Sequence, residues 1–412
     1  MSSQNPDSAR AQSGVGAEPE AQEGFLDRSQ NSERSSTAPD DGTPAAPATA
    51  IGAGNAAAAG LGGVEIGTGI GAAAAADWDD GPTTVAGTLR KLVSANEAWT
   101  GIALILIMAF FTIRAPGKFL TTSDLSNISA NAAPLLVMAI GQTFVILTAG
   151  IDLSVGSVLV LAGVVAGEYY QHQPGAGLNA SWGVILVGLL IAIAVGTAFG
   201  TVQGFVIAKA KVPPLITTLA GLLVAEGFSY LITNGSDIRS VPTRLSGTIG
   251  LGSIGGVPWL VVISFALALV FGLILAYTGF GRYTYAVGSN PEAALRAGIK
   301  VDRHLIKVYA LQGLLSGAAG LLSLAYFGTS TISGHSTDNL TVITAVVLGG
   351  ASLFGGRGSM FGTVLGVFIP AMLLTGLVIL AVNQYWQYVA IGLVLGAAVY
   401  LDQFRRRLRE RS

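Results

Sequence analysis

The residues best placed to do chemistry lie around one acidic side chain in an apolar run. The segment Leu147–Gly163 reads LTAGIDLSVGSVLVLAG and places Asp152 close to Gly150, Ser154 and Ser157. A carboxylate at bilayer depth costs about 3 kcal/mol on insertion scales, so it is retained where it faces protein partners or water. One interpretation is a broken or bent helix that the acid orders, and the other is a loop carboxylate at a helix N-cap. Both interpretations predict a polar kink between two apolar segments.

Polar side chains recur inside neighbouring apolar segments of the chain. Such groups within a helical bundle are candidates for a solute pathway, and the alternative is hydrogen bonding between helices, which is equally compatible with each residue taken singly. Glu226 lies near the middle of a different apolar segment and is the weaker candidate. The predicted pathway residues are Gln142, Thr143, Asp152, Ser154, Ser157 and Glu226.

The longest polar connection, Gly279–Lys307, contains a second candidate site. Asn290 is a suitable N-cap, Pro291 suits the first helical position, and a short helix over Glu292–Ala297 is predicted to stop at Gly298. A short, well-capped helix can dock in a cleft of a partner protein. The alternative is an ordinary surface helix between two membrane spans.

No catalytic motif emerges, and we predict that the chain is not an enzyme and needs no cofactor or metal. There is no HExxH and no GxxxxGK[ST], and cysteine is absent. The Gly349–Gly362 run lacks the lysine of a phosphate loop and is interpreted as a tight, mobile turn between two helices, with Arg357 at the inner interface. His172, His304 and His335 are interpreted as solvated loop residues. Any energy input must therefore come from a partner or from an ion gradient.

Composition indicates an all-α integral membrane protein with a polar tail. Of the 412 residues, 51% are hydrophobic and only 11% are charged, whereas soluble domains have about 25% charged residues. Residues 1–89 are first polar and then rich in Ala and Gly, which predicts a disordered low-complexity tail before a membrane domain over 90–412. The net charge of -1 gives nucleic acid no electrostatic attraction.

Apolar runs long enough to span a bilayer, about 20 residues each, recur through the membrane domain. The short runs are expected to be broken or re-entrant, so we predict a polytopic bundle of eight to ten transmembrane helices. The candidate runs are Ala98–Ile113, Ala132–Leu147, Leu153–Gly167, Val184–Ala208, Pro214–Ile232, Val257–Tyr277, Leu305–Phe327, Leu340–Leu348, Phe361–Ala381 and Tyr388–Leu401.

Positive charge predicts the orientation of these spans. Ten spans with both ends in the cytoplasm place most Lys and Arg of the connections inside, including Lys209, Lys211 and the basic run Arg405–Arg411. Trp182 then lies at an outer end, as an aromatic belt requires. Glycines at four-residue spacing predict close helix packing. They are Gly196, Gly200 and Gly204; Gly313 and Gly317; Gly362 and Gly366; and Gly392 and Gly396.

Three motifs together resemble one family. GIDLSVGS at Gly150–Ser157, NPEAALRAGI at Asn290–Ile299 and the glycine-rich Leu340–Gly366 are similar to the permease subunits of ATP-binding-cassette sugar importers of the ribose, xylose and arabinose type. The resemblance extends from about Ala98 to the end of the chain. The long N-terminal tail departs from it.

The resemblance implies a division of labour. Two permease copies form the pathway, a cytoplasmic ATP-binding subunit docks on a coupling helix of each, and an extracytoplasmic sugar-binding protein delivers a monosaccharide. It implies a bacterial inner-membrane location and places Gly150–Ser157 near the path. The residues that match the coupling motif are Asn290, Pro291, Glu292, Ala293, Ala294, Arg296 and Gly298.

Two other functions stay open at this point. An ion-coupled secondary transporter would use Asp152 and Glu226 to carry protons. A membrane scaffold that transports nothing would recruit partners through the long inside connection.

Overall fold

The structure is a computed structural model that describes residues 96–239, 241–330 and 332–410. The chain separates into two units, Met1–Trp78 and Asp79–Ser412. All of the first unit lies outside the described residues, and so does the predicted tail over residues 1–89.

The described part of the second unit is almost entirely helical, which confirms the predicted class. Its two short strands pair antiparallel, with Ser253 opposite Pro258. The elements are α2 Asn96–Arg114, α3 Thr122–Leu147, α4 Val155–Gln171, η1 Pro174–Gly177, α5 Trp182–Lys209, α6 Pro214–Thr233, η2 Leu245–Gly250, β1 Ser253–Ile254, β2 Val257–Pro258, α7 Trp259–Tyr277, α8 Gly279–Ser289, α9 Pro291–Arg296, α10 Val301–Phe327, η3 Ile332–His335, α11 Asp338–Leu348, α12 Met360–Ile379 and α13 Gln384–Glu410.

Within the described ranges, six helices are long and apolar enough to cross a membrane: α3, α5, α6, α7, α10 and α12. Ala98–Arg114 of α2, together with α4 and α11, are shorter apolar helices. At 1.5 Å per residue, the 11 residues of α11 extend only about 16 Å, roughly half of a bilayer core. The polytopic helical bundle is therefore confirmed, and α4 and α11 are the short elements that the sequence predicts.

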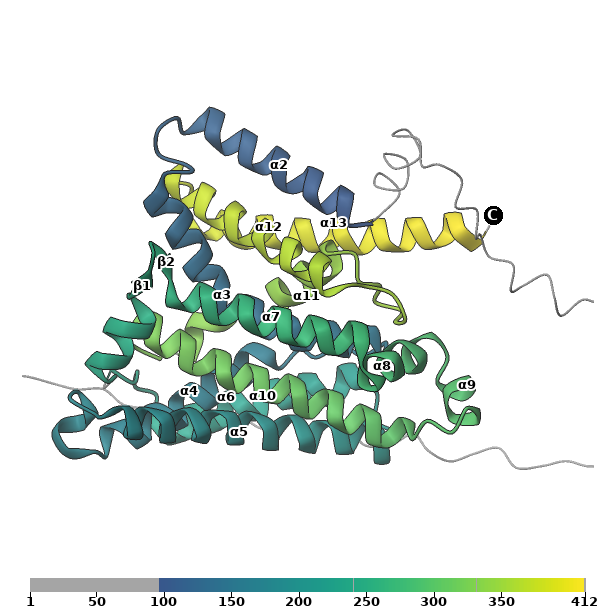
Figure 1. Cartoon of the computed structure of the whole chain (residues 1–412), viewed down its shortest axis with the longest axis horizontal. Helices are drawn as coiled ribbons and strands as arrows, with labels where there is room; N and C mark the ends of the chain where they lie inside the picture. Colours follow the sequence, from purple (N-terminus) through teal and green to yellow (C-terminus); the bar gives the residue numbers. More distant parts are fainter. Residues whose placement is uncertain (1–95, 240, 331, 411–412) are drawn as a thin grey trace, which may run out of the picture. The chain divides into compact units, whose positions relative to one another are not determined.

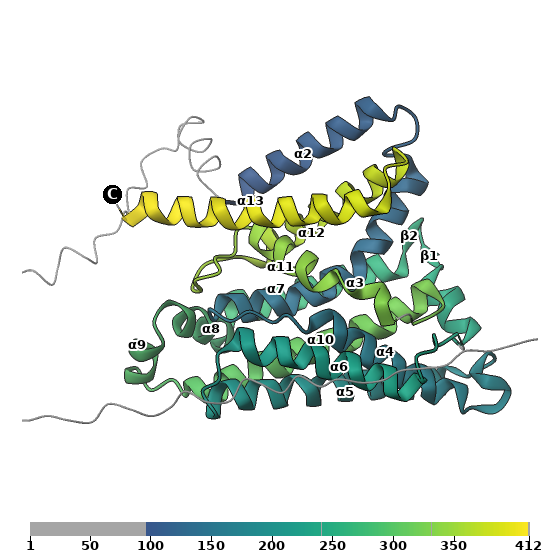
Figure 2. The ribbon, with the colours of Figure 1, turned by 180° about the vertical axis from the view of Figure 1, so that it is seen from behind.

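Helices α3 and α10 form the interior of the bundle, and α5, α6 and α7 form its periphery. The apolar window of α3 is 89% buried and that of α10 is 78% buried, whereas those of α5, α6 and α7 are between 22% and 28% buried. Figures 1 and 2 show α5 and α10 running side by side over most of their length. Polar side chains in the middle of α3 and α10, such as Gln142 and Gln312, are consequently shielded from any surrounding solvent.

The close approach of α5 and α10 depends on the predicted glycine faces. A methyl group at Gly196 would overlap the carbonyl oxygen of Gly313, and one at Gly200 would overlap the carbonyl oxygen of Tyr309. In lipid, where no hydrophobic effect drives helices together, such backbone proximity provides van der Waals attraction between them. Of the other predicted faces, Gly362 and Gly366 pack on α11, whereas a methyl at Gly392 or Gly396 would meet nothing in the described chain.

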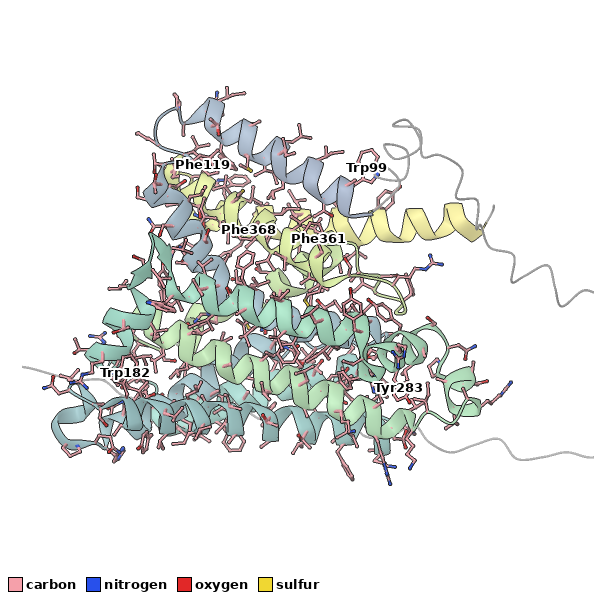
Figure 3. All side chains as sticks on the ribbon, in the orientation of Figure 1. Trp99, Phe119, Trp182, Tyr283, Phe361 and Phe368 are labelled. Carbon is pink, nitrogen blue, oxygen red and sulfur yellow. The ribbon has the colours of Figure 1, made fainter. Side chains whose placement is uncertain are left out.

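The connection between α7 and α10 holds more structure than the sequence indicates. We predict one short helix there, but α8 precedes α9 and α10 begins at Val301, inside the expected connection. Thr278 starts α8, because its hydroxyl accepts a hydrogen bond from the Gly281 N–H at 3.4 Å. The glycines and polar residues of α8 obscure its helical pattern in the sequence. Figure 3 shows Tyr283 of α8 and Trp182 of α5 at opposite ends of the bundle.

Candidate functional site

The predicted kink is a complete interruption between α3 and α4. Helix α3 ends at Leu147, and Ala149 adopts a left-handed conformation with φ +60°, which is unfavourable for a residue with a side chain. The next helical residue is Val155, and its N-cap is Ser154 rather than Asp152. We call Thr148–Ser154 the break. Of the two interpretations of the kink, the broken helix is confirmed and the N-cap carboxylate is wrong.

Asp152 orders the end of the break through two short hydrogen bonds. Its carboxylate Oδ1 accepts from the Ser154 N–H at 2.8 Å and from the Ser154 hydroxyl at 2.6 Å. The residue is only 2% exposed, and within the described ranges no cation lies within ion-pair distance of it. Hydroxyl and backbone donors therefore stabilise the buried charge in place of a salt bridge.

Gln203 of α5 extends this arrangement to a third helix. Its side-chain Nε2 donates to the Ser154 hydroxyl at 2.9 Å, and the residue is 4% exposed. We call Asp152, Ser154 and Gln203 the Asp152 cluster. Gln203 was not among the predicted residues, although a single amide in the otherwise apolar stretch Val202–Ala208 is a signal that could have identified it.

A second set of buried polar atoms, on α3 and α10, has no hydrogen-bond partners in the described chain. Both side-chain polar atoms of Gln142, the Tyr309 hydroxyl and Gln312 Oε1 are buried in this state. Each such unsatisfied group costs about 1 to 3 kcal/mol. Tyr309 lies beside the break, because a methyl at Gly150 would meet its hydroxyl at 2.5 Å. These atoms can take hydrogen bonds from water or from a hydroxylated solute, and only Gln142 among them was predicted.

The other three predicted pathway residues lie outside the Asp152 cluster. The Thr143 hydroxyl is 2.7 Å from that of Thr363, which is a hydrogen bond between α3 and α12. Ser157 is buried in α4, one turn beyond the Asp152 cluster. Glu226 is partly exposed on α6 and makes no hydrogen bond or ion pair with the described residues. The structure therefore brings Asp152 and Ser154 together and leaves Glu226 out of their contacts.

Two of the three histidine predictions are wrong. His172 is exposed at the end of α4, as expected, with a side-chain exposure of 80%. His304 is 5% exposed inside the first turns of α10, where its Nε2 lies 3.0 Å from the Thr284 hydroxyl. His335 packs between the Ser323 hydroxyl and the Asp338 carboxylate at 2.8 and 2.6 Å. Both are structural contacts between helices, which isolated positions in the sequence do not reveal.

The predicted docking helix forms as α9. The Asn290 side chain accepts from the Ala293 N–H at 2.9 Å, Pro291 occupies the first turn, and Ala294 is the buried anchor at 4% exposure. Gly298 follows with φ +83°, a conformation that glycine adopts without strain. We call Asn290–Gly298 the docking segment. The cap and the stop are confirmed, and the helix ends at Arg296, one residue earlier than predicted.

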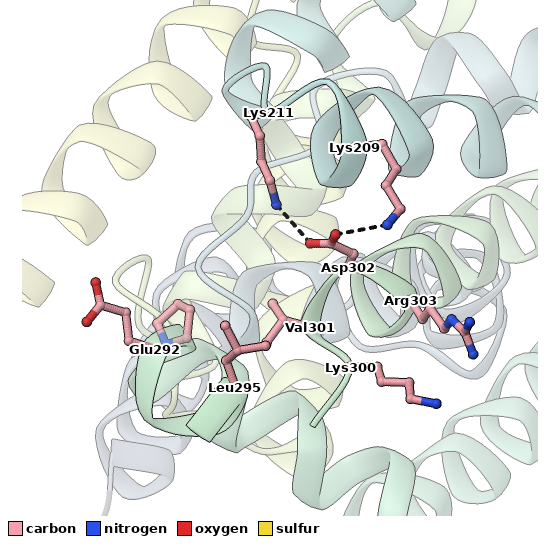
Figure 4. A pocket seen from close by; sticks show the side chains of 9 residues that line it. Lys209, Lys211, Glu292, Leu295, Lys300, Val301, Asp302 and Arg303 are labelled. Atoms are coloured by element: carbon pink, nitrogen blue, oxygen red, sulfur yellow. Dashed lines mark hydrogen bonds and ion pairs between the residues drawn. The ribbon is translucent and has the colours of Figure 1, made fainter. Parts of the chain in front are cut away.

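The docking segment presents a mixed surface. Glu292 and Arg296 form an exposed ion pair at 3.5 Å, and the apolar Leu295 is 64% exposed beside them. Behind this helix lies a pocket of about 500 Å³ at the junction with the ends of α5 and α10 (Figure 4). Its lining residues are Lys209, Lys211, Pro291, Glu292, Leu295, Lys300, Val301, Asp302 and Arg303.

The glycine-rich run after α11 is the predicted turn between two helices, and it contacts the helix that precedes each of the two sites. The Gly356 N–H donates to the Leu147 carbonyl oxygen at 2.9 Å, at the last residue of α3. The Tyr285 hydroxyl of α8 donates to the Gly358 carbonyl oxygen at 2.8 Å. The turn thus connects the helix before the docking segment to the start of the break.

Comparisons with known proteins agree with these features. Residues 125–399 match the family model described as the permease component of the branched-chain amino acid transport system. The chain is 38% identical to the ribose import permease protein RbsC of Escherichia coli (strain K12) over 304 residues, which are 73% of this chain and 92% of the relative.

The names of two further relatives describe transport of the same kind. The fructose import permease protein FrcC of Rhizobium meliloti is 34% identical, covering 77% of this chain and 88% of its own. The xylose transport system permease protein XylH of Haemophilus influenzae is 32% identical, covering 74% of this chain and 96% of its own. No solved structure matches the chain.

Proposed function

The chain belongs to the family of permease components that the branched-chain amino acid transport model describes, and from its similarity to sugar import permeases we propose that it carries a monosaccharide through the inner membrane. Its relatives import ribose, fructose and xylose, according to their names. The substrate class is accordingly a pentose or hexose. The chain itself is a multi-pass membrane protein of the sugar-importer type.

The single observation that carries the proposal is the buried polar interior at the break. A neutral sugar offers hydroxyl groups that both donate and accept, and the interior offers a carboxylate, amides and hydroxyls. Tyr309 holds an unsatisfied hydroxyl beside the break, Gln142 holds two unsatisfied polar atoms earlier on α3, and Asp152 holds the backbone of the break in place. In the proposed mechanism, Gln142, Asp152, Ser154 and Ser157 lie along the sugar path, and Glu226 is a separate, weaker candidate.

Energy for transport would enter through the docking segment. The chain has no phosphate-binding loop of the Walker type, so a cytoplasmic ATP-binding subunit is the proposed partner. The exposed Leu295 and the Glu292–Arg296 pair suit a cleft with an apolar floor and a charged rim. Two permease copies and an extracytoplasmic sugar-binding protein complete the proposed importer.

The proposed orientation places α9 in the cytoplasm. The end of α13 lies at the same end of the bundle as α9 in both ribbon views (Figures 1 and 2). Both chain termini are then cytoplasmic, as the distribution of Lys and Arg predicts.

The proposed cycle is alternating access. ATP binding draws the docking segments of two copies together, and each copy changes between inward-facing and outward-facing arrangements around the break. The partners need only bind one arrangement better than the other, since a difference of about 5.5 kcal/mol reverses a population from 1:99 to 99:1.

A reconstitution experiment tests this function. The chain is placed in liposomes with an ATP-binding subunit and a sugar-binding protein from the same organism, and uptake of labelled D-ribose, D-xylose and D-fructose is measured. We expect uptake of at least one sugar that requires ATP inside the liposomes and persists when ionophores collapse the ion gradients. Uptake that follows the proton or sodium gradient would support the secondary transporter instead, and assembly without any solute flux would support the scaffold.

A further inference from the structure

One carboxylate joins three elements at the α9 end of the bundle. Asp302, in the first turn of α10, accepts from Lys209 Nζ at 3.1 Å and from Lys211 Nζ at 2.8 Å (Figure 4). Lys209 is the last residue of α5, and Lys211 lies in the turn before α6. We call this arrangement the lysine bridge. It ties the start of α10 to the turn between α5 and α6.

The turn that carries the two lysines is stiff. Lys211 has φ +58°, a left-handed conformation that costs a residue with a side chain about 1 kcal/mol or more. Pro213 and Pro214 follow, and each fixes its own backbone φ and removes an N–H donor. A pull on the lysine side chains therefore moves the ends of α5 and α6 in preference to deforming the turn.

Backbone hydrogen bonds connect the docking segment to the first turn of α10, which contains Asp302. The Ile299 N–H donates to the Ala294 carbonyl oxygen at 3.0 Å, and the Val301 N–H donates to the Ile299 carbonyl oxygen at 2.9 Å. His304, two residues after Asp302, contacts Thr284 of α8 at 3.0 Å. The end of α8, the docking segment and the first turn of α10 consequently form one hydrogen-bonded block.

Helices α5 and α6 both contact the break. Gln203, about two turns before the end of α5, donates to the Ser154 hydroxyl at 2.9 Å. Thr218, in the second turn of α6, donates to the Ile151 carbonyl oxygen at 3.1 Å. A continuous series of hydrogen bonds and helix segments thus runs from the docking segment through Asp302, the two lysines and these two helices to the break.

We propose that Asp302 is a positioning residue through which a displacement of the docking segment is passed to the break. This inference rests on the proposed function, because it assigns the displacement to the ATP-binding partner. The series reaches Ile151 and Ser154, whereas the direct packing of Gly288 of α8 against the Leu147 carbonyl oxygen reaches only the start of the break. A displacement of the docking segment would thus reach both ends of the break by separate routes. It would change the bend of the break without moving the break as a whole.

The exposure of the lysine bridge suits a role in transmitting movement rather than a role in stabilising the fold. The Asp302 side chain is 32% exposed, and those of Lys209 and Lys211 are 50% and 69% exposed. Ion pairs at such sites contribute little to folding stability, so removing Asp302 should leave the helix bundle intact. A functional change in Asp302→Asn then reports lost transmission instead of lost structure.

The first test measures the mechanical link in this chain alone. The sequence has no cysteine, so spin labels attach only at Ala210→Cys, beside the bridge, and at Ala297→Cys, at the end of α9. Both positions are exposed. We expect a narrow distance distribution between the labels, a clearly broader one in Asp302→Asn, and recovery in Asp302→Glu. An unchanged distribution in Asp302→Asn would overturn the inference, since the bridge would then not hold the two parts together.

The matched control is Asp237→Asn. Asp237 makes an exposed ion pair with Arg239 at 4.0 Å, in the connection after α6, and within the described ranges it makes no hydrogen bond or ion pair with the docking segment. It removes the same charge from a comparable surface site. We expect its label distances and melting temperature to match those of the unsubstituted chain.

The second test measures coupling in the reconstituted importer. Asp302→Asn should raise the ATP consumed per sugar transported by about fivefold, the lower end of typical coupling strengths, with an unchanged melting temperature. Asp302→Glu should restore the ratio. If the unsubstituted importer shows no ATP-dependent uptake, the proposed function fails, and the spin-label test still decides whether the bridge positions α9. If it transports normally and Asp302→Asn has the same ratio, the inference fails alone.

Discussion

Two aspartates hold the two regions on which transport is proposed to depend, and they do so by different means. Asp152 is 2% exposed and is held by a hydroxyl and a backbone N–H of Ser154. Asp302 has a 32% exposed side chain and is held by two lysine ammonium groups. An aspartate carboxylate thus has neutral hydrogen-bond donors as partners inside the bundle and charged lysines as partners at the end of the bundle.

The difference follows from the cost of removing charges from water. Burying a lysine beside Asp152 would add a second desolvation penalty, whereas neutral donors satisfy the carboxylate without one. At the α9 end, water and ions screen the pairs, so they form and break at little cost. The Asp152 contacts therefore suit a site that must keep its shape. The Asp302 contacts suit a site that passes on movement and must change between two arrangements.

The largest effect is expected at the interior aspartate. Asp152→Ala removes the acceptor for two hydrogen bonds, worth about 1.5 to 3 kcal/mol each where a charge is involved, and should lower uptake by at least about tenfold. Asp152→Asn keeps one acceptor oxygen and should give an intermediate loss. Uptake is normalised to the amount of folded protein in the membrane, with Thr197→Ala as a control on α5. Full uptake by Asp152→Ala would remove the break from the mechanism.

A smaller effect is expected at the end of the docking segment. Gly298→Val places a β-branched side chain at φ +83°, which disfavours the native turn and should misplace α9. We expect weaker co-purification with the ATP-binding subunit and lower ATP-dependent uptake, with normal membrane insertion. Gly255→Val is a matched control, because Gly255 also has positive φ, lies in the exposed β1–β2 connection and has open space around it. Normal partner binding by Gly298→Val would contradict the docking role.

The contacts of the two aspartates should differ in their sensitivity to salt. At about 1 M NaCl the Debye length falls to about 3 Å, so the exposed lysine bridge weakens while the buried Asp152 contacts do not. The distance distribution between labels at Ala210→Cys and Ala297→Cys should broaden with salt. Hydrogen exchange of a peptide that covers residues 148–156 should stay constant over the same range. Equal sensitivity of both regions would show that the Asp152 site is open to solvent.

The smallest effect is expected at Glu226. This side chain makes none of the contacts of the Asp152 cluster, so Glu226→Gln should leave sugar uptake within about twofold of the unsubstituted importer. Uptake is measured at two external pH values, because a proton-carrying acid would make the loss depend on pH. A severe, pH-dependent loss would favour the ion-coupled transporter.

Local sequence patterns predicted those elements whose start, stop or interruption is set by neighbouring residues. Asn290, Pro291 and Gly298 define a helix start and stop by their own backbone preferences, and both lie where predicted within one residue. The interruption near Asp152 was predictable because a charge and small residues in an apolar run oppose a continuous membrane helix. Helix α8 was missed because its cap, Thr278, is followed by glycines that weaken any helical pattern.

The partners of the site residues were not predictable, since they come from distant parts of the chain. Gln203 and Ser154 are 49 positions apart, and Lys209 and Asp302 are 93 positions apart. His304 and His335 were assigned to solvent because nothing in their local sequence shows Thr284 or Ser323 beside them. These pairings depend on how the helices pack, which the sequence pattern indicates only as a tendency of glycine faces to meet.

The sequence by itself determined that this chain is a helical membrane protein with one polar interruption and one short capped helix, because hydropathy and backbone preference act over a few residues. Only the tertiary structure decided which polar groups meet. The glycine faces of α5 and α10 bring backbones into contact, and that packing places Gln203 against the break and Lys209 against Asp302.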